Sequence, residues 1–187
     1  MSLLWIVLIV IGAVLLYAIA AYNGFISLKT RTEEAWSDIT VQLKRRYDLI
    51  PNLVSAVRGY AKHEKGVFEE VTKARAEAMS AKGMSSKAEA EKSLADALKS
   101  VFAVAENYPN LKANENFLQL QGELSETENK IEASRRYYNA NVRDFNIKIK
   151  SFPTNLIANM FSFKSKDLFD VAQSEKAEVE KAPKVEV

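Results

Sequence analysis

Residues 3–22 read LLWIVLIVIGAVLLYAIAAY, a stretch without a single charged side chain. At a rise of about 1.5 Å per residue, an α-helix of this length spans roughly 30 Å, the thickness of the hydrocarbon core of a bilayer. Trp5 and Tyr22 stand near its two ends, where aromatic rings with a polar edge favour the headgroup level. We therefore predict a membrane anchor at residues 1–22, a helix in the lipid bilayer whose ends are marked by Leu3, Trp5 and Tyr22.

A cleaved signal peptide is the alternative, because Ala18-Ile19-Ala20 has the small-x-small form of a cleavage site. Two features favour the anchor: no basic residue precedes the apolar run, and the run is longer than the apolar core of most signal peptides. Lys29 and Arg31 follow the run, and basic residues favour the cytoplasmic side. We expect a single-pass protein of the cell membrane, with the N-terminus outside and the soluble part in the cytoplasm.

The composition excludes several kinds of functional site. The 187 residues include 26 Lys and Arg, 24 Asp and Glu, one His and no Cys. Without Cys there is no disulfide or thiolate site, and one His excludes a metal site built from several histidines of a single chain. The net charge of +2 is too balanced for a generic nucleic-acid-binding protein. We expect no enzyme activity, cofactor, metal, nucleic acid or small-molecule substrate.

Apolar residues recur every three or four positions after the anchor, which predicts an all-α fold. The expected architecture is an elongated antiparallel four-helix bundle over residues 23–170, closed by a short C-terminal helix. Its long helices are predicted at about 23–46, from about 49 to a loop at 80–85, at 86–106 and at 112–150. Residues 171–187 lack an apolar stripe and are predicted to be disordered.

Two helix starts are predicted from capping residues. Asp48 is a plausible N-cap for the second helix, with Pro51 in its first turn, although Pro51 would also fit as a kink in one continuous helix. Ser86-Lys87-Ala88-Glu89 fits a capping box that opens the third helix.

Residues 35–64 read AWSDITVQLKRRYDLIPNLVSAVRGYAKHE, a pattern that closely resembles the signature of the LemA family. The resemblance continues in VTKAR at 71–75, YYNANVRDFN at 137–146 and SFPTNLIANMFSF at 151–163. It implies an N-terminal transmembrane helix, an extracellular N-terminus and a soluble four-helix bundle. The family includes a protein involved in magnetosome formation, and no enzymatic activity is attached to it. The resemblance therefore implies architecture more than function.

The basic run Lys44-Arg45-Arg46 is one candidate partner surface. It would pair with acidic side chains of neighbouring helices or dock an acidic partner. If the first soluble helix is unbent, Lys44 lies roughly 30 Å beyond the anchor, which argues against contact with the chain's own membrane.

Residues 152–163 (FPTNLIANMFSF) form a second candidate surface through Phe161 and Phe163. The segment would cap the open end of the bundle or, if the fourth helix returns to the bilayer, lie in the membrane interface. The hypothesis that this segment lies in the membrane interface requires a helix break at Pro51. If one continuous helix ran through Pro51, the fourth helix would run in the opposite direction and would not return to the bilayer.

The sequence as a whole predicts a membrane-anchored helical-bundle scaffold or adaptor that binds unidentified protein partners or forms a homo-oligomer. A structural protein that remodels membranes is the alternative, and a non-catalytic subunit of a membrane enzyme complex is a third interpretation.

Overall fold

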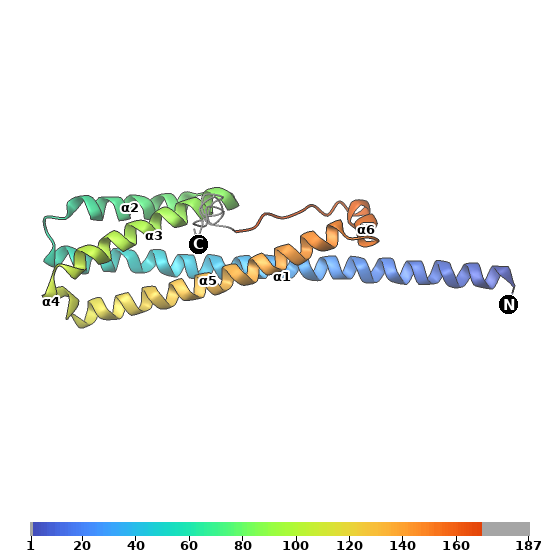
Figure 1. Cartoon of the computed structure of the whole chain (residues 1–187), viewed down its shortest axis with the longest axis horizontal. Helices are drawn as coiled ribbons and strands as arrows, with labels where there is room; N and C mark the ends of the chain where they lie inside the picture. The colour runs from blue at the N-terminus through green and yellow to red at the C-terminus, as the bar shows by residue number, and fades with distance from the viewer. Residues whose placement is uncertain (1, 170–187) are drawn as a thin grey trace, which may run out of the picture. The chain divides into compact units, whose positions relative to one another are not determined.

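A computed structural model describes residues 2–169, so the tail predicted at 171–187 lies outside the described residues. Within residues 2–169 the chain forms helices and no strand. The helices are α1 (Leu3–Tyr60), α2 (Lys65–Ser80), α3 (Met84–Glu106), α4 (Pro109–Lys112), α5 (Glu115–Lys150) and α6 (Thr154–Met160) (Figure 1). The all-α prediction is therefore confirmed, including the short helix towards the C-terminus.

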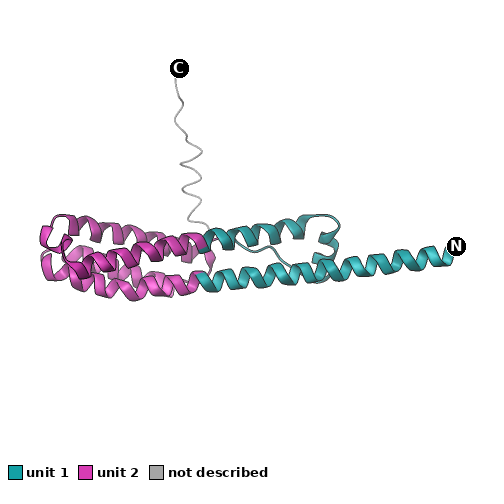
Figure 2. Cartoon of the chain, turned by 90° about the horizontal axis from the view of Figure 1, so that it is seen from below, with its two compact units in different colours: residues 1–38, 134–168 teal, residues 39–133, 169–187 magenta. Residues whose placement is uncertain are grey.

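The chain divides into two compact units, which Figure 2 distinguishes by colour. The first unit comprises residues 1–38 and 134–168, which hold the beginning of α1, the end of α5, α6 and the segment after it. The second unit comprises residues 39–133 and 169–187, and it contains the rest of α1, all of α2, α3 and α4, and the beginning of α5. Each unit has a buried apolar core of its own.

The second unit buries one apolar stripe from each of its four long helices. Residues 61–64 join α1 to α2, and residues 81–83 join α2 to α3, connections short enough to make consecutive helices antiparallel neighbours (Figure 1). The buried side chains recur at spacings of three and four residues, as a helix face requires. They are Ile39, Leu43, Ile50, Leu53 and Val57 of α1; Phe68, Val71, Ala74 and Ala78 of α2; Leu94, Leu98 and Val101 of α3; and Phe117, Leu124 and Ile131 of α5.

Pro51 does not break the first helix. It lies inside α1, so the predicted N-cap at Asp48 is wrong and the alternative of one continuous helix is correct. A proline within a helix has no N–H to bond to the carbonyl four residues earlier, which here belongs to Tyr47. The Nε–H of Arg75 on α2 donates to that carbonyl oxygen at 2.7 Å. A contact between two helices thus supplies the bond that α1 lacks, and α1 continues to Tyr60.

The turn that was expected near Pro51 lies at residues 61–64 instead. The structure thus has the predicted number of turns, with the first at residues 61–64 instead of near Pro51. Three long helices, α1, α2 and α3, therefore still precede α5. The expectation that a continuous helix at Pro51 would reverse the direction of the fourth helix is therefore wrong.

The third helix begins before its predicted capping box. Its first residue is Met84, and Gly83 precedes it with a φ of 85°, a conformation that glycine adopts without steric cost. Ser86 and Glu89 lie inside the helix, and no side chain caps its N-terminus. The capping-box prediction is wrong because a glycine turn, rather than a serine cap, starts α3.

The substitution Arg75→Met is expected to lower the free energy of unfolding by about 1–3 kcal/mol, because the Tyr47 carbonyl loses its partner inside the bundle. In a Pro51→Ala background the new N–H can bond to that carbonyl, so the same substitution should cost less. Chemical denaturation of the detergent-solubilised full chain, followed by circular dichroism, measures both costs. Equal costs in the two backgrounds would contradict the role given to Arg75.

Candidate functional site

The first unit carries the apolar end of α1. Almost every side chain from residue 3 to residue 20 is exposed, Leu3 and Trp5 among them. Within the described residues, α1 is the helix whose length and composition would allow it to cross a membrane. Tyr22 differs from the other two predicted end residues, because it is half-buried with its ring centroid 4.6 Å from that of Phe161.

A cluster of aromatic rings forms the core of this unit where the apolar run of α1 ends. The ring of Phe163 stacks on that of Phe25 with centroids 4.8 Å apart, and it meets the ring of Phe145 edge-on at 6.2 Å. The small and aliphatic residues buried with these rings are Ala21, Ile157 and Ala158. Phe163 is thus partly buried and packs against this core, while its predicted role in a partner surface stays a prediction. For Phe163, the interpretation of residues 152–163 as a cap on the core applies.

Large apolar side chains of the same segment remain exposed beside this core. Phe152 is 80% exposed, Leu156 58%, Met160 74% and Phe161 50%. Leu156 and Met160 are four residues apart and share one face of α6, because side chains at that spacing neighbour each other on a helix. One face of α6 is thus buried in the core through Ile157 and Ala158. The face that carries Leu156 and Met160 is also apolar, but it is exposed.

The segment after α6 is fixed to α5 by hydrogen bonds. The side-chain amide of Asn146 donates to the Lys166 carbonyl at 2.8 Å and accepts from the Lys166 N–H at 2.9 Å. The Tyr138 hydroxyl donates to the Asp167 carbonyl at 3.0 Å. Burial, and to a lesser degree the Asp167 carboxylate, raise the pKa of Tyr138, so the hydroxyl keeps the proton that it donates. These bonds hold residues 161–168 where Phe163 can enter the core.

Lysines border the aromatic cluster. The Nζ of Lys148 lies 5.0 Å from the centre of the Phe25 ring and occupies the space that a side chain at Gly24 would need. Burial lowers the pKa of Lys148, because the ammonium loses part of its hydration. Lys166 lies over the Phe145 ring at 5.9 Å, with its Nζ 3.6 Å from the Glu33 carboxylate.

The second unit buries a cluster of charges around Arg46. This residue is only 2% exposed, and its two terminal guanidinium nitrogens pair with Glu91 of α3 and Glu128 of α5. Arg46 is therefore removed from the predicted partner surface, because it pairs within the bundle. Lys44 and Arg45, the other members of the basic run, are exposed.

Glu91 is held by three partners. Besides Arg46, it accepts a hydrogen bond from the Tyr47 hydroxyl and lies 3.6 Å from the Nζ of Lys87. Burial and the bond to Glu91 raise the pKa of Tyr47, which therefore stays protonated as a donor. Two cations, two carboxylates and a hydroxyl thus pair with one another across α1, α3 and α5, while the Nε of Arg46 is buried without a hydrogen-bond partner among the described residues.

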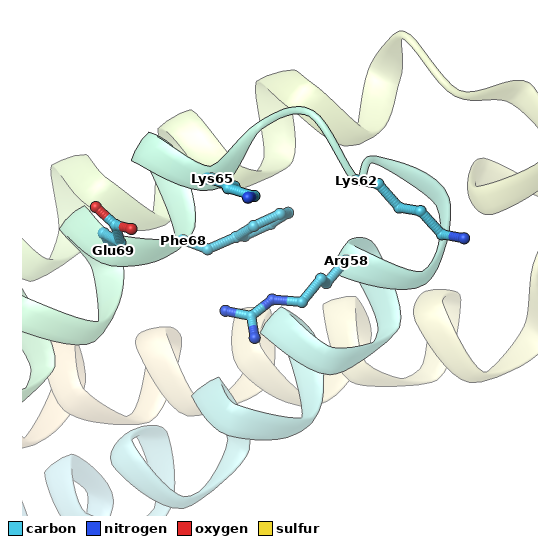
Figure 3. Close-up of a pocket in the computed structure, with 5 residues that line it drawn as sticks. All are labelled: Arg58, Lys62, Lys65, Phe68 and Glu69. Atoms are coloured by element: carbon cyan, nitrogen blue, oxygen red, sulfur yellow. The ribbon is translucent and has the colours of Figure 1, made fainter.

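A pocket of about 490 Å³ lies where α1 turns into α2. Arg58, Lys62, Lys65, Phe68 and Glu69 line it (Figure 3). The guanidinium of Arg58 lies 5.5 Å from the centre of the Phe68 ring. Arg58 and Lys65 lie beside the Phe68 ring, whereas Lys62 points away from it (Figure 3). With Glu69 as the one acidic residue of the lining, the excess of positive charge suits an anionic group. The pocket was not predicted from the sequence, because a helix break at Pro51 places the turn elsewhere, although the basic residues at 58, 62 and 65 were a signal. Residues 2–169 contain no group of three His, Asp or Glu side chains placed to hold a metal ion.

The profile of the LemA family matches residues 35–186 of the sequence. The chain belongs to the LemA family. Among its relatives, Protein LemA of Metamycoplasma hominis is 27% identical, and the alignment covers 93% of this chain and 78% of that protein.

Magnetosome proteins are further relatives of this LemA-family chain. Magnetosome protein MamQ 2 of Paramagnetospirillum magneticum is 27% identical over 79% of this chain and 64% of that protein. Magnetosome protein MamQ of Magnetospirillum gryphiswaldense is 23% identical, with the same coverage of 79% and 64%. The chain thus spans less than two thirds of the length of these magnetosome relatives. The family match includes the buried charges and the rings of Phe145 and Phe163, whereas the apolar run at residues 3–22 precedes it.

In this LemA-family chain, Arg46→Met is expected to destabilise the bundle by about 2–4 kcal/mol, because buried Glu91 loses its guanidinium partner and keeps only Lys87 and the Tyr47 hydroxyl. Arg45→Met is the matched control: it removes the same side chain from an exposed neighbouring position and should change stability by less than about 0.5 kcal/mol. Denaturation of the full chain in detergent measures both. Similar losses for the two variants would contradict a structural role specific to Arg46.

Proposed function

We propose that this LemA-family chain is a membrane-anchored scaffold or adaptor, which acts by binding protein partners or further copies of itself. The observation that carries the proposal is that α1 is one continuous helix from its exposed apolar end to the buried cores. Its exposed apolar residues 3–20 continue without a break into residues that build the cores, Phe25 in the first unit and Ile39 in the second. An apolar helix without protein neighbours is suited to lipid, and its continuation would hold the bundle at the membrane surface.

The packing of α1 also favours an anchor over a cleaved signal peptide. Ala18-Ile19-Ala20 lies within the helix, and Ala18 packs against the same core that buries Ala21. Cleavage there would remove part of the surface on which this core is assembled.

We further propose that the bundle is cytoplasmic and the N-terminus outside. Lys29 and Arg31 follow the apolar run directly, and the fold adds Lys148 beside Gly24. Basic side chains close to a span favour the cytoplasmic side.

The proposed activity is binding rather than catalysis. The buried titratable groups of the second unit, Arg46 and Glu91, are occupied by each other and by their neighbours. We therefore infer a structural role for them, without turnover of a substrate. For an acidic partner, the contacts that we propose are the exposed Lys44 and Arg45 and the basic pocket at Arg58.

Membrane remodelling is the second candidate function. Two observations favour it: some relatives are named magnetosome proteins, and α6 exposes an apolar face in the same unit as the apolar end of α1. An apolar helix face inserted into one leaflet is a way to act on the shape of a bilayer.

A topology experiment tests the anchor and its orientation, and the absence of Cys allows single labelling sites. Ser2→Cys and Ser85→Cys place one thiol at an exposed position before the span and one at the beginning of α3. With a membrane-impermeant maleimide, Ser2→Cys should react in intact cells and Ser85→Cys only after lysis. The opposite pattern would overturn the orientation. A shortened Ser85→Cys chain in the medium would overturn the anchor.

A further inference from the structure

The exposed apolar face of α6 needs an explanation. Phe152, Leu156, Met160 and Phe161 bring four large apolar side chains to the surface within ten residues, and none of the residues from Ser151 to Phe163 is charged. Apolar patches of this kind mark places where a protein meets another protein or a membrane. We call these four side chains the α6 patch.

The α6 patch is fixed to α1 at the end of the apolar run. Phe161 lies against Tyr22, and α6 packs on Ala21 and Phe25 through Ile157 and Ala158. Tyr22 is the last residue of the proposed anchor, and the first charged side chain after it is Lys29. The depth that Tyr22 takes in a membrane therefore sets the depth of α6, because Tyr22 and α6 pack on the same core.

The charges around the α6 patch fit the same location. Lys148 and Lys150 precede the uncharged segment along the chain, and Lys164 and Lys166 follow it. Lys150 and Lys164 are exposed, whereas Lys148 lies over the Phe25 ring and Lys166 pairs with Glu33. Lysines beside an apolar surface extend their ammonium groups to lipid phosphates while their stems stay in the apolar region. An apolar face bounded on both sides by cations is the pattern expected of a helix lying in a membrane interface.

We propose that the α6 patch inserts into the boundary between headgroups and acyl chains, in the leaflet on the bundle side of the anchor. The inference rests on the membrane anchor proposed above and extends it. The chain then holds the bilayer at two adjoining places, through α1 across the membrane and through α6 along its surface. Among possible occupants of the patch, the bilayer is favoured over a second protein because the patch continues the surface that the anchor already offers to lipid.

Depth-dependent fluorescence quenching tests the proposal on the full chain. Leu156→Cys carries an environment-sensitive fluorophore, and the chain is reconstituted in vesicles of phosphatidylcholine with a minority of phosphatidylglycerol. Lipids with a nitroxide just below the headgroup should quench this label several-fold more than a label at Ser37→Cys. Ser37 is an exposed position of α1 that lies about 22 Å along the helix from Tyr22, at 1.5 Å per residue. Adding Phe152→Ser and Met160→Ser should reduce the quenching at residue 156.

A third label separates this proposal from the anchor. Ala13→Cys lies near the middle of the apolar run and should be quenched by a nitroxide at the end of the acyl chain. Quenching at residue 13 with none at residue 156 overturns the insertion of α6 and leaves the anchor standing. No quenching at residue 13 overturns the anchor and the present inference with it. A label at residue 156 that is shielded from aqueous iodide but unaffected by nitroxide lipids means that protein covers the patch, and this also overturns the proposal.

Discussion

The hydrogen bond from Arg75 to the carbonyl oxygen of Tyr47 replaces the bond that Pro51 removes from α1. Pro51 deprives that carbonyl of its partner within α1, and a helix normally ends or bends at such a point. Because α2 returns alongside and provides a guanidinium, α1 continues for nine more residues, to Tyr60. The turn at residues 61–64, the pocket formed by that turn and the order in which the later helices follow all depend on this continuation. The local sequence predicts a helix end near Pro51, whereas the contact with Arg75 allows the helix to continue. In the structure the helix continues.

Much of the core was readable from spacing alone. Apolar side chains at the predicted spacing of three or four residues are buried, Leu43, Leu94 and Phe117 among them, because a helix that packs on neighbours needs one continuous apolar face. The end of the fourth helix at Lys150 was also predictable, since Phe152-Pro153 follows it. Helix starts were less predictable. A serine followed three residues later by a glutamate has the form of a capping box whether or not a glycine turn lies just before it, as Gly83 does.

The buried charges could have been found from the same periodicity. Arg46 stands seven residues after Ile39 and seven before Leu53, so it lies on the apolar stripe of α1 rather than beside it. Glu91 has the same relation to Leu98 on α3. One cation and one anion on two apolar stripes that must face each other predict an ion pair. The Arg75 contact, in contrast, left no such signal, because it joins a side chain of one helix to a backbone carbonyl of another.

The charge cluster has a consequence for how the helices of the second unit select one another. Their apolar stripes repeat every turn, so stripes alone would allow α3 to slide along α1 by three or four residues with little loss of burial. Arg46 opposes such a shift: after a displacement of three residues it would face Ala88 or Leu94 instead of Glu91. Its guanidinium would then keep only the partly exposed Glu128, and losing a buried carboxylate partner is costly. The cluster therefore fixes the register of α3 relative to α1. It excludes alternative alignments of these helices that hydrophobic burial by itself would tolerate.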